Sequence, residues 1–111
     1  MVKIIVVLKR KSGMTMEEFS QYWYEEHGPL ALRIMPEVKK YIQNHTVRLT
    51  DGEEPQFDGI AELWFDDPES CHRFLDWYLR DRGKVLRNDE EKFMDRRKMF
   101  GLIVDERVIK P

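Results

Sequence analysis

The chain has 111 residues, of which 41% are hydrophobic and 36% are charged, and its formal net charge is −2. A chain of this length supports one hydrophobic core, so we expect a single domain over residues 1–111. The interspersed charges form no basic stripe, and this excludes nucleic acid as an expected partner.

The chain begins with a strand signal at residues 2–9, a nearly unbroken aliphatic run that predicts burial on both faces of a sheet. The run is too short to span a bilayer, and no small-residue cleavage site of a signal peptide follows it. Cys71 is the single cysteine, so no intrachain disulfide can form. We therefore expect a cytoplasmic protein with no membrane partner.

A helix start follows at Thr15, which forms a capping box with Glu18. Helical spacing then relates Phe19, Trp23, His27 and Leu30. Gly28 predicts the C-cap of this helix, and Pro29 prevents its simple continuation. A short second helical piece is expected at residues 30–35.

Two strands are predicted next, at residues 38–49 and 59–65, with a polar turn at residues 50–56 between them. Alternation in the first of these strands places Tyr41, Gln43 and His45 on one face. In the second strand, Glu62 and Trp64 share a face.

A second helix is predicted from Asp67 as N-cap, with Pro68 at the first helical position. Its buried stripe consists of Cys71, Phe74, Leu75, Tyr78 and Leu79. We interpret Cys71 as a core residue. Residues 80–88 are expected to be a charged connection, residues 89–97 another helical turn, and residues 100–109 the last strand.

This order of elements predicts an α+β fold of the ferredoxin-like βαββαβ type. Such a fold has a four-stranded antiparallel sheet with helices on one face. The first strand is apolar on both faces, so solvent is an improbable neighbour for the other face of the sheet. A homodimer that packs two sheets face to face would cover it.

Four segments of the chain, in order and with matching spacing, resemble the EthD family of the dimeric α+β-barrel superfamily. They are FSQYWYEEHGP at 19–29, YIQNH at 41–45, FDGIAELWF at 57–65, and Asp89-Glu90 with Phe93. The resemblance implies a homodimeric α+β barrel with a cavity for a small apolar organic ligand in each subunit. Members of the family are linked to ether degradation and to decarboxylation or dehydration of aromatic polyketides. More distant barrel relatives include cofactor-free monooxygenases, lactone isomerases and haem-degrading proteins, so the function must be argued from the site.

His27 is the strongest candidate for a catalytic residue. It lies on the apolar stripe of the first helix, near a helix end that favours its protonated form, while burial favours the neutral form. An imidazole balanced near neutrality can accept and return a proton. The structural alternative is that His27 hydrogen-bonds within the core and fixes the turn that follows.

Six further side chains are expected to contact a substrate: Tyr22, Trp23, Tyr41, His45, Glu62 and Trp64. The aromatic rings could form the walls of a site for a flat ligand, although aromatic stripes more often belong to the core. The face that carries Tyr41 and His45 meets either the ligand or the dimer partner. Glu62 acts as a general base or, alternatively, pairs with an arginine.

No metal or cofactor is expected, because the three histidines lie on separate elements and the sequence contains no CxxC, GxGxxG or P-loop motif. The first hypothesis is therefore a cofactor-independent enzyme, a lyase, isomerase or monooxygenase that transfers protons on a small cyclic or aromatic compound. Its reaction would be isomerisation, dehydration, decarboxylation or oxygenation. The alternative is a non-catalytic binding or accessory module for an apolar intermediate. A haem protein, with His27 or His72 as axial ligand, ranks below both.

Overall fold

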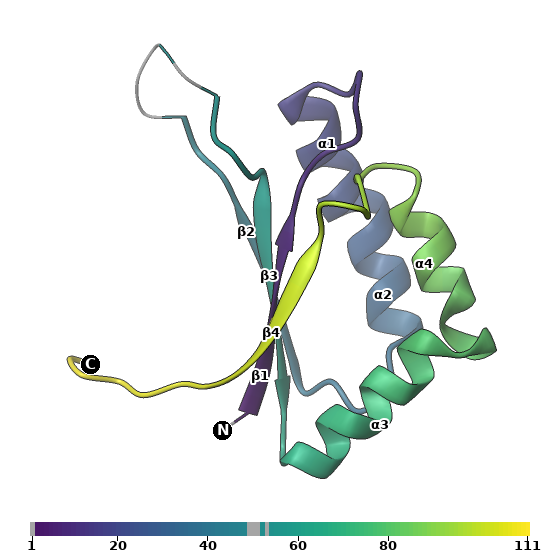
Figure 1. The fold of residues 1–111 in the computed structure, drawn as a ribbon, viewed down its shortest axis with the longest axis vertical. Coiled ribbons are helices and arrows are strands. Elements are labelled where there is room, and N and C mark those ends of the chain that lie inside the picture. Colours follow the sequence, from purple (N-terminus) through teal and green to yellow (C-terminus); the bar gives the residue numbers. More distant parts are fainter. Residues whose placement is uncertain (1, 49–51, 53) are drawn as a thin grey trace.

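The computed structural model describes residues 2–48, 52 and 54–111 and contains a four-stranded antiparallel sheet with its helices on one face (Figure 1). The spatial order of the strands is β2-β3-β1-β4. Their bounds are Val2–Leu8 for β1, Lys40–His45 for β2, Gly59–Phe65 for β3 and Phe100–Asp105 for β4. The α+β ferredoxin-like fold expected from the sequence is confirmed.

Within the described residues, six helical segments connect or flank the strands. They are α1 (Met16–Tyr22), the π-helical turn η1 (Trp23–His27), α2 (Gly28–Ile34), α3 (Pro68–Leu79), the short η2 (Asp81–Gly83) and α4 (Lys84–Glu90). In the described part of the chain, none of these helices has the length and apolar character needed to cross a bilayer.

The position of β1 between β3 and β4 explains why its sequence is apolar except at Lys3. Ile4 and Leu8 belong to the core beneath the helices, whereas the alternate residues face the other side of the sheet. We call that side the outer face, and pairing along the strands places on it Lys3, Ile5, Val7, Ile42, Asn44, Ile60, Glu62, Trp64, Phe100, Leu102 and Val104. In Figure 1 no helix covers the outer face.

The first helix starts as predicted but does not end where predicted. Thr15 and Glu18 form the capping box. Gly28, however, is not a C-cap, because its φ of −55° and ψ of −52° are right-handed helical values and its N–H donates to the carbonyl of Trp23 five residues earlier. A π turn of this kind widens the helix without ending it. Pro29 has no N–H to lose, so it can follow the widened turn as the chain continues into α2.

Two predicted strands are shorter than expected. The first of them, predicted at residues 38–49, is regular only over β2, and position 49 lies outside the described residues. The predicted turn also includes positions 50, 51 and 53, which are likewise not described. The last strand ends at Asp105 and not at residue 109, because Asp105 pairs with Val2, where β1 begins.

The segment predicted as a charged connection contains a helix. Residues 80–88 include η2 and most of α4, while residues 91–97 form turns. In α4, Lys84 and Asn88 are exposed and Leu86 lies in the core, an amphipathic pattern that the polar composition of the segment obscures. The helix ends with two buried acids, Asp89 and Glu90.

The second helix agrees with its prediction except at its end, where Leu79 of the predicted buried stripe is 71% exposed because α3 ends there. Asp67 caps α3 by accepting a hydrogen bond from the backbone N–H of Ser70. Cys71 is buried in the core, and burial raises the pKa of its thiol.

Candidate functional site

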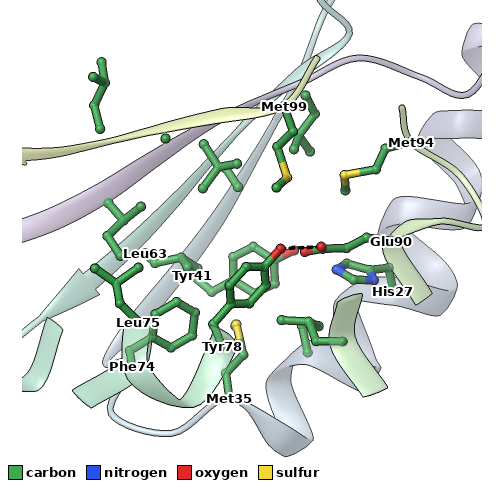
Figure 2. A pocket seen from close by; sticks show the side chains of 18 of the residues that line it. His27, Met35, Tyr41, Leu63, Phe74, Leu75, Tyr78, Glu90, Met94 and Met99 are labelled. Carbon is green, nitrogen blue, oxygen red and sulfur yellow. Dashed lines mark hydrogen bonds between the residues drawn. The ribbon is translucent and has the colours of Figure 1, made fainter. Parts of the chain in front are cut away.

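A cavity of about 370 Å³ lies between the helix-covered face of the sheet and the helices. Aliphatic side chains such as Ile4, Val6 and Leu63 line its sheet side, and methionine, aromatic and aliphatic side chains complete most of its wall. Four of the lining residues carry an imidazole, hydroxyl or carboxyl group: His27, Tyr41, Tyr78 and Glu90 (Figure 2). An apolar cavity with a few convergent polar groups is typical of a small-molecule site.

His27 is held by a carboxylate that lies behind it. Its Nδ1 is 2.7 Å from Oδ2 of Asp89, and the hydroxyl of Tyr22 donates to Oδ1 of the same carboxylate at 2.7 Å. The π turn η1 supplies His27, and α4 supplies Asp89. No residue in the described ranges hydrogen-bonds Nε2 of His27, and the ring lines the cavity. The contact with Asp89 therefore fixes the orientation of the imidazole. Nδ1 is occupied by the carboxylate, and Nε2 is available to a ligand in the cavity.

The environment of this pair sets its charge state. Burial lowers the pKa of His27, although hydrogen bonding and charge from Asp89 oppose this effect. Burial tends to raise the pKa of Asp89, but the hydrogen bonds from Tyr22 and His27 outweigh it, and the net pKa lies below its usual value. At neutral pH the result is an ionised Asp89 that accepts Nδ1–H from a neutral His27. Nε2 then carries a lone pair that can accept a proton.

A second set of hydrogen bonds orients Tyr41. The amide of Gln43 donates to the hydroxyl oxygen of Tyr41 and to the carbonyl of Trp23, both at 2.9 Å. Nε2 of His45 is 2.9 Å from Oε1 of Gln43, and Nδ1 of His45 is 2.6 Å from the hydroxyl of Ser20. Because the Tyr41 oxygen accepts from Gln43, its own O–H remains free to donate into the cavity. Burial raises the pKa of Tyr41, which keeps this proton in place.

Glu90 is the one acidic side chain in the cavity wall (residues 2–48, 52 and 54–111 considered). Its Oε1 accepts from the hydroxyl of Tyr78 at 2.5 Å and from Nε of Arg96 at 3.1 Å. Burial raises the pKa of Glu90, while Tyr78 and Arg96 act in the opposite direction. Burial and the charge of Glu90 raise the pKa of Tyr78.

A family model described as the EthD domain matches residues 11–97, well over half of the chain. The chain belongs to the EthD family. An EthD family protein from Bacillus halodurans has a similar structure, with a TM-score of 0.70 and 25% identity over 96% of this chain and 99% of the other.

Two further solved structures share the fold. A protein from Arabidopsis thaliana has a TM-score of 0.68 and 14% identity, with both chains covered completely (100% and 100%). A dimeric protein of unknown function with a ferredoxin-like fold, from Bacteroides fragilis, has a TM-score of 0.61 and 14% identity over 95% of each chain. No curated protein sequence matches this EthD chain.

The residues expected to form the site separate into three groups within this EthD fold. His27, Trp23 and Tyr41 line the cavity. Tyr22 and His45 do not line it and act through an intermediate residue. Tyr22 hydrogen-bonds Asp89, which holds His27, and His45 hydrogen-bonds Gln43, which holds Tyr41. Glu62 and Trp64 lie on the outer face, away from the cavity.

The two outer-face residues have partners of their own. Glu62 accepts hydrogen bonds from Lys3 at 2.6 Å and from Asn44 at 3.0 Å, and these bonds lower its pKa. The Lys3 ammonium lies 4.4 Å from the centroid of the Trp64 ring. Glu62 is therefore paired with a cation, a lysine and not the arginine that the structural alternative anticipated.

Sequence reasoning assigned no role to Tyr78, Asp89 or Glu90. Tyr78 appeared only as part of an apolar stripe, and the two acids only as part of the EthD resemblance. One available signal was the spacing of Leu86, Glu90 and Phe93, which places the acid on the buried side of a helix and turn. Among the described residues, no group of three or more histidine, cysteine or acidic side chains could hold a metal ion.

Proposed function

We propose that this protein is a cofactor-independent enzyme in which His27 transfers a proton on a small cyclic or aromatic compound bound in the cavity. The supporting observation is the 2.7 Å contact between His27 and Asp89, in which the imidazole also lines an otherwise apolar cavity. A carboxylate behind an imidazole fixes its tautomer and stabilises the imidazolium that forms on proton transfer.

The proposed reaction begins at a carbon next to a carbonyl group of the substrate. Nε2 of His27 accepts the proton from this carbon, and the electron pair of the C–H bond moves into the carbonyl, whose oxygen gains negative charge. The Tyr41 hydroxyl donates a hydrogen bond to that oxygen. Return of the proton from His27 to a different carbon gives isomerisation. Transfer of the same proton to a hydroxyl group on the adjacent carbon, whose C–O bond breaks as the C=C bond forms, releases water and gives dehydration. The apolar wall limits the access of water.

The proposed assembly is a homodimer in which the outer faces of two copies pack together. This face exposes Ile60, Phe100 and Leu102. Burial of these apolar side chains between two copies favours association. The Bacteroides fragilis protein with the same fold is described as dimeric.

The activity can be tested with α-tetralone, a bicyclic ketone whose acidic C–H bonds lie next to the carbonyl. Proton NMR in deuterium oxide measures how fast these hydrogens exchange, and calorimetry measures binding. We expect the wild type to accelerate exchange above the buffer rate and His27→Gln to lower the rate by about 100-fold or more. Affinity for the ketone and thermal stability should stay close to wild type. The matched control is His72→Gln, which changes an exposed histidine on α3.

Three outcomes would contradict the proposal in different ways. Tight binding without exchange above the buffer rate would favour a binding or accessory module for an apolar intermediate. A parallel loss of stability and activity in His27→Gln would indicate the structural role of this histidine. Absence of ketone binding by the wild type would exclude the cavity as the site for such ligands.

A further inference from the structure

Glu90 has one oxygen occupied and one available. Both of its hydrogen bonds, from Tyr78 and Arg96, reach Oε1, and no residue in the described ranges hydrogen-bonds Oε2. The side chain is 9% exposed, and Figure 2 shows it directed into the cavity next to the hydroxyl of Tyr78. A proton on this carboxyl group would therefore reside on Oε2, where it is free to be donated.

No lysine or arginine is among the residues that line the cavity. Arg96, which contacts Glu90 from outside, is already engaged by Tyr78 at 3.2 Å and by Glu91 at 3.6 Å. A carboxylate ligand would therefore lose its hydration without gaining a cationic partner, and it would face an acidic side chain. Burial of an unpaired charge is strongly unfavourable.

We propose that Glu90 and Tyr41 form a hydrogen-bond-donating end of the cavity that selects a neutral carbonyl oxygen and rejects a carboxylate. This inference rests on the proposed function, because it assumes that the cavity holds the substrate. In the proposed reaction, Oε2–H of Glu90 protonates the carbonyl oxygen as His27 removes the proton from carbon. The product of this step is a neutral enol, and Glu90 recovers its proton when the enol reverts to a carbonyl.

The surroundings of Glu90 favour the protonated carboxyl that this role requires. The charged and titratable groups around it are Tyr78 on α3, Tyr41 on β2, Arg87 and Asp89 on α4, His27 on η1, and Arg96 in the following turn. Burial outweighs the two arginines and raises the pKa of Glu90. The O–H of Tyr41, free because its oxygen accepts from Gln43, supplies the second donor.

The test compares two ligands of nearly equal shape, methyl naphthyl ketone and naphthoate substituted at the same ring position. Calorimetry should show that the wild type binds the ketone at least about tenfold more tightly. Glu90→Gln keeps a donor and cannot ionise. At a pH high enough to ionise Glu90 in the wild type, the substitution should therefore raise naphthoate affinity about tenfold, and at a pH where Glu90 is protonated it should change ketone affinity less than about threefold. Glu91→Gln is the matched control, because it removes the same charge from the neighbouring, exposed residue and should behave as wild type.

Two further measurements of ketone affinity test the two donors, Glu90 and Tyr41, separately. Ketone affinity of the wild type should fall as the pH rises and Glu90 loses its proton, whereas Glu90→Gln should show no such fall. Tyr41→Phe should lower ketone affinity about fivefold at unchanged charge. Equal binding of both ligands by the wild type, or an unchanged preference in Glu90→Gln, would overturn this inference and leave the proposed function standing. Failure of the wild type to bind either ligand would overturn both.

Discussion

Asp89 and Glu90 are neighbours in the chain, yet their carboxyl groups have opposite environments. Asp89 accepts hydrogen bonds from His27 and Tyr22, and its pKa is lowered. Glu90 lines the apolar cavity, and its pKa is raised. Two carboxyl groups whose pKa values are shifted apart are suited to different tasks, one to stabilise a positive imidazolium and the other to donate a proton.

Asp89→Asn should lower the rate of proton transfer without preventing the ketone from binding. The asparagine amide can donate to Nδ1 of His27, which would leave the proton of the neutral ring on Nε2, the nitrogen that must act as base. We expect α-tetralone exchange to fall about 100-fold or more, together with a further decrease in the pKa of His27 because the favourable charge is lost. Proton NMR measures both the exchange rate and the imidazole titration.

The control for this substitution is Asp76→Asn. It removes a carboxylate of α3 that forms an exposed ion pair with Arg80. It should change neither the rate of α-tetralone exchange nor the pKa of His27. An Asp89→Asn protein that exchanges α-tetralone at the wild-type rate would show that Asp89 does not orient the base.

His27 should make the stability of the fold depend on pH. Burial lowers its pKa in the folded state below the ordinary 6.5, so the unfolded chain binds this proton more tightly. The stability that neutral His27 provides is therefore complete above about pH 7 and decreases as the pH falls through 6.5 towards the folded-state pKa. Thermal unfolding of wild type and His27→Gln, compared across this range, should show a steeper acid-side loss for the wild type.

Comparison of the two proteins isolates the contribution of His27. Burial also lowers the pKa of His45, but His45 is present in both proteins and its effect cancels. Parallel stability curves from about pH 8 to about pH 5 would show that His27 has the same pKa in the folded and unfolded chains.

The parts of the fold with local chemical signals could be predicted from the sequence. Thr15 with Glu18, and Asp67 with Pro68, mark helix starts through side-chain groups that satisfy backbone donors within the same turn. The end of the first helix could not be predicted in the same way. Gly28 and Pro29 ordinarily stop a helix, but the π turn and the amide of Gln43, donated from a distant strand, satisfy the carbonyl of Trp23.

The site could be predicted only in part, because contacts between segments that are distant in the chain decide which side chains meet. Alternation shows which residues of a strand share a face, but not which face meets the helices. The helix-covered face of the sheet carries Tyr41, Gln43 and His45, and of these three Tyr41 lines the cavity. Glu62 and Trp64 lie on the outer face. The position of Asp89 behind His27 depends on α4 packing across the first helix, a contact between residues 62 positions apart.

Gly59→Ala should destabilise the protein through Trp23. A Cβ at position 59 would collide with the six-membered part of the Trp23 indole, which is fully buried in the core. Displacement of a large core ring typically costs about 1–3 kcal/mol. Urea unfolding should report this loss. Gly101→Ala is the matched control, because its Cβ would come no closer than 3.5 Å to any neighbouring atom, and an equal loss in both variants would argue against the contact with Trp23.

Ile60→Glu should separate the proposed dimer into monomers. Ile60 is 41% exposed on the outer face, in β3 between β2 and β1, so two new carboxylates would be buried or brought together at the interface. Leu32→Glu is the matched control, because Leu32 is 76% exposed on α2, on the helical side of the sheet. Light scattering coupled to size-exclusion chromatography should report a dimer for wild type and Leu32→Glu and a monomer for Ile60→Glu. A monomeric wild type, or an Ile60→Glu protein that remains dimeric, would exclude the outer face as the interface, because the introduced charge should not be tolerated between two packed apolar faces.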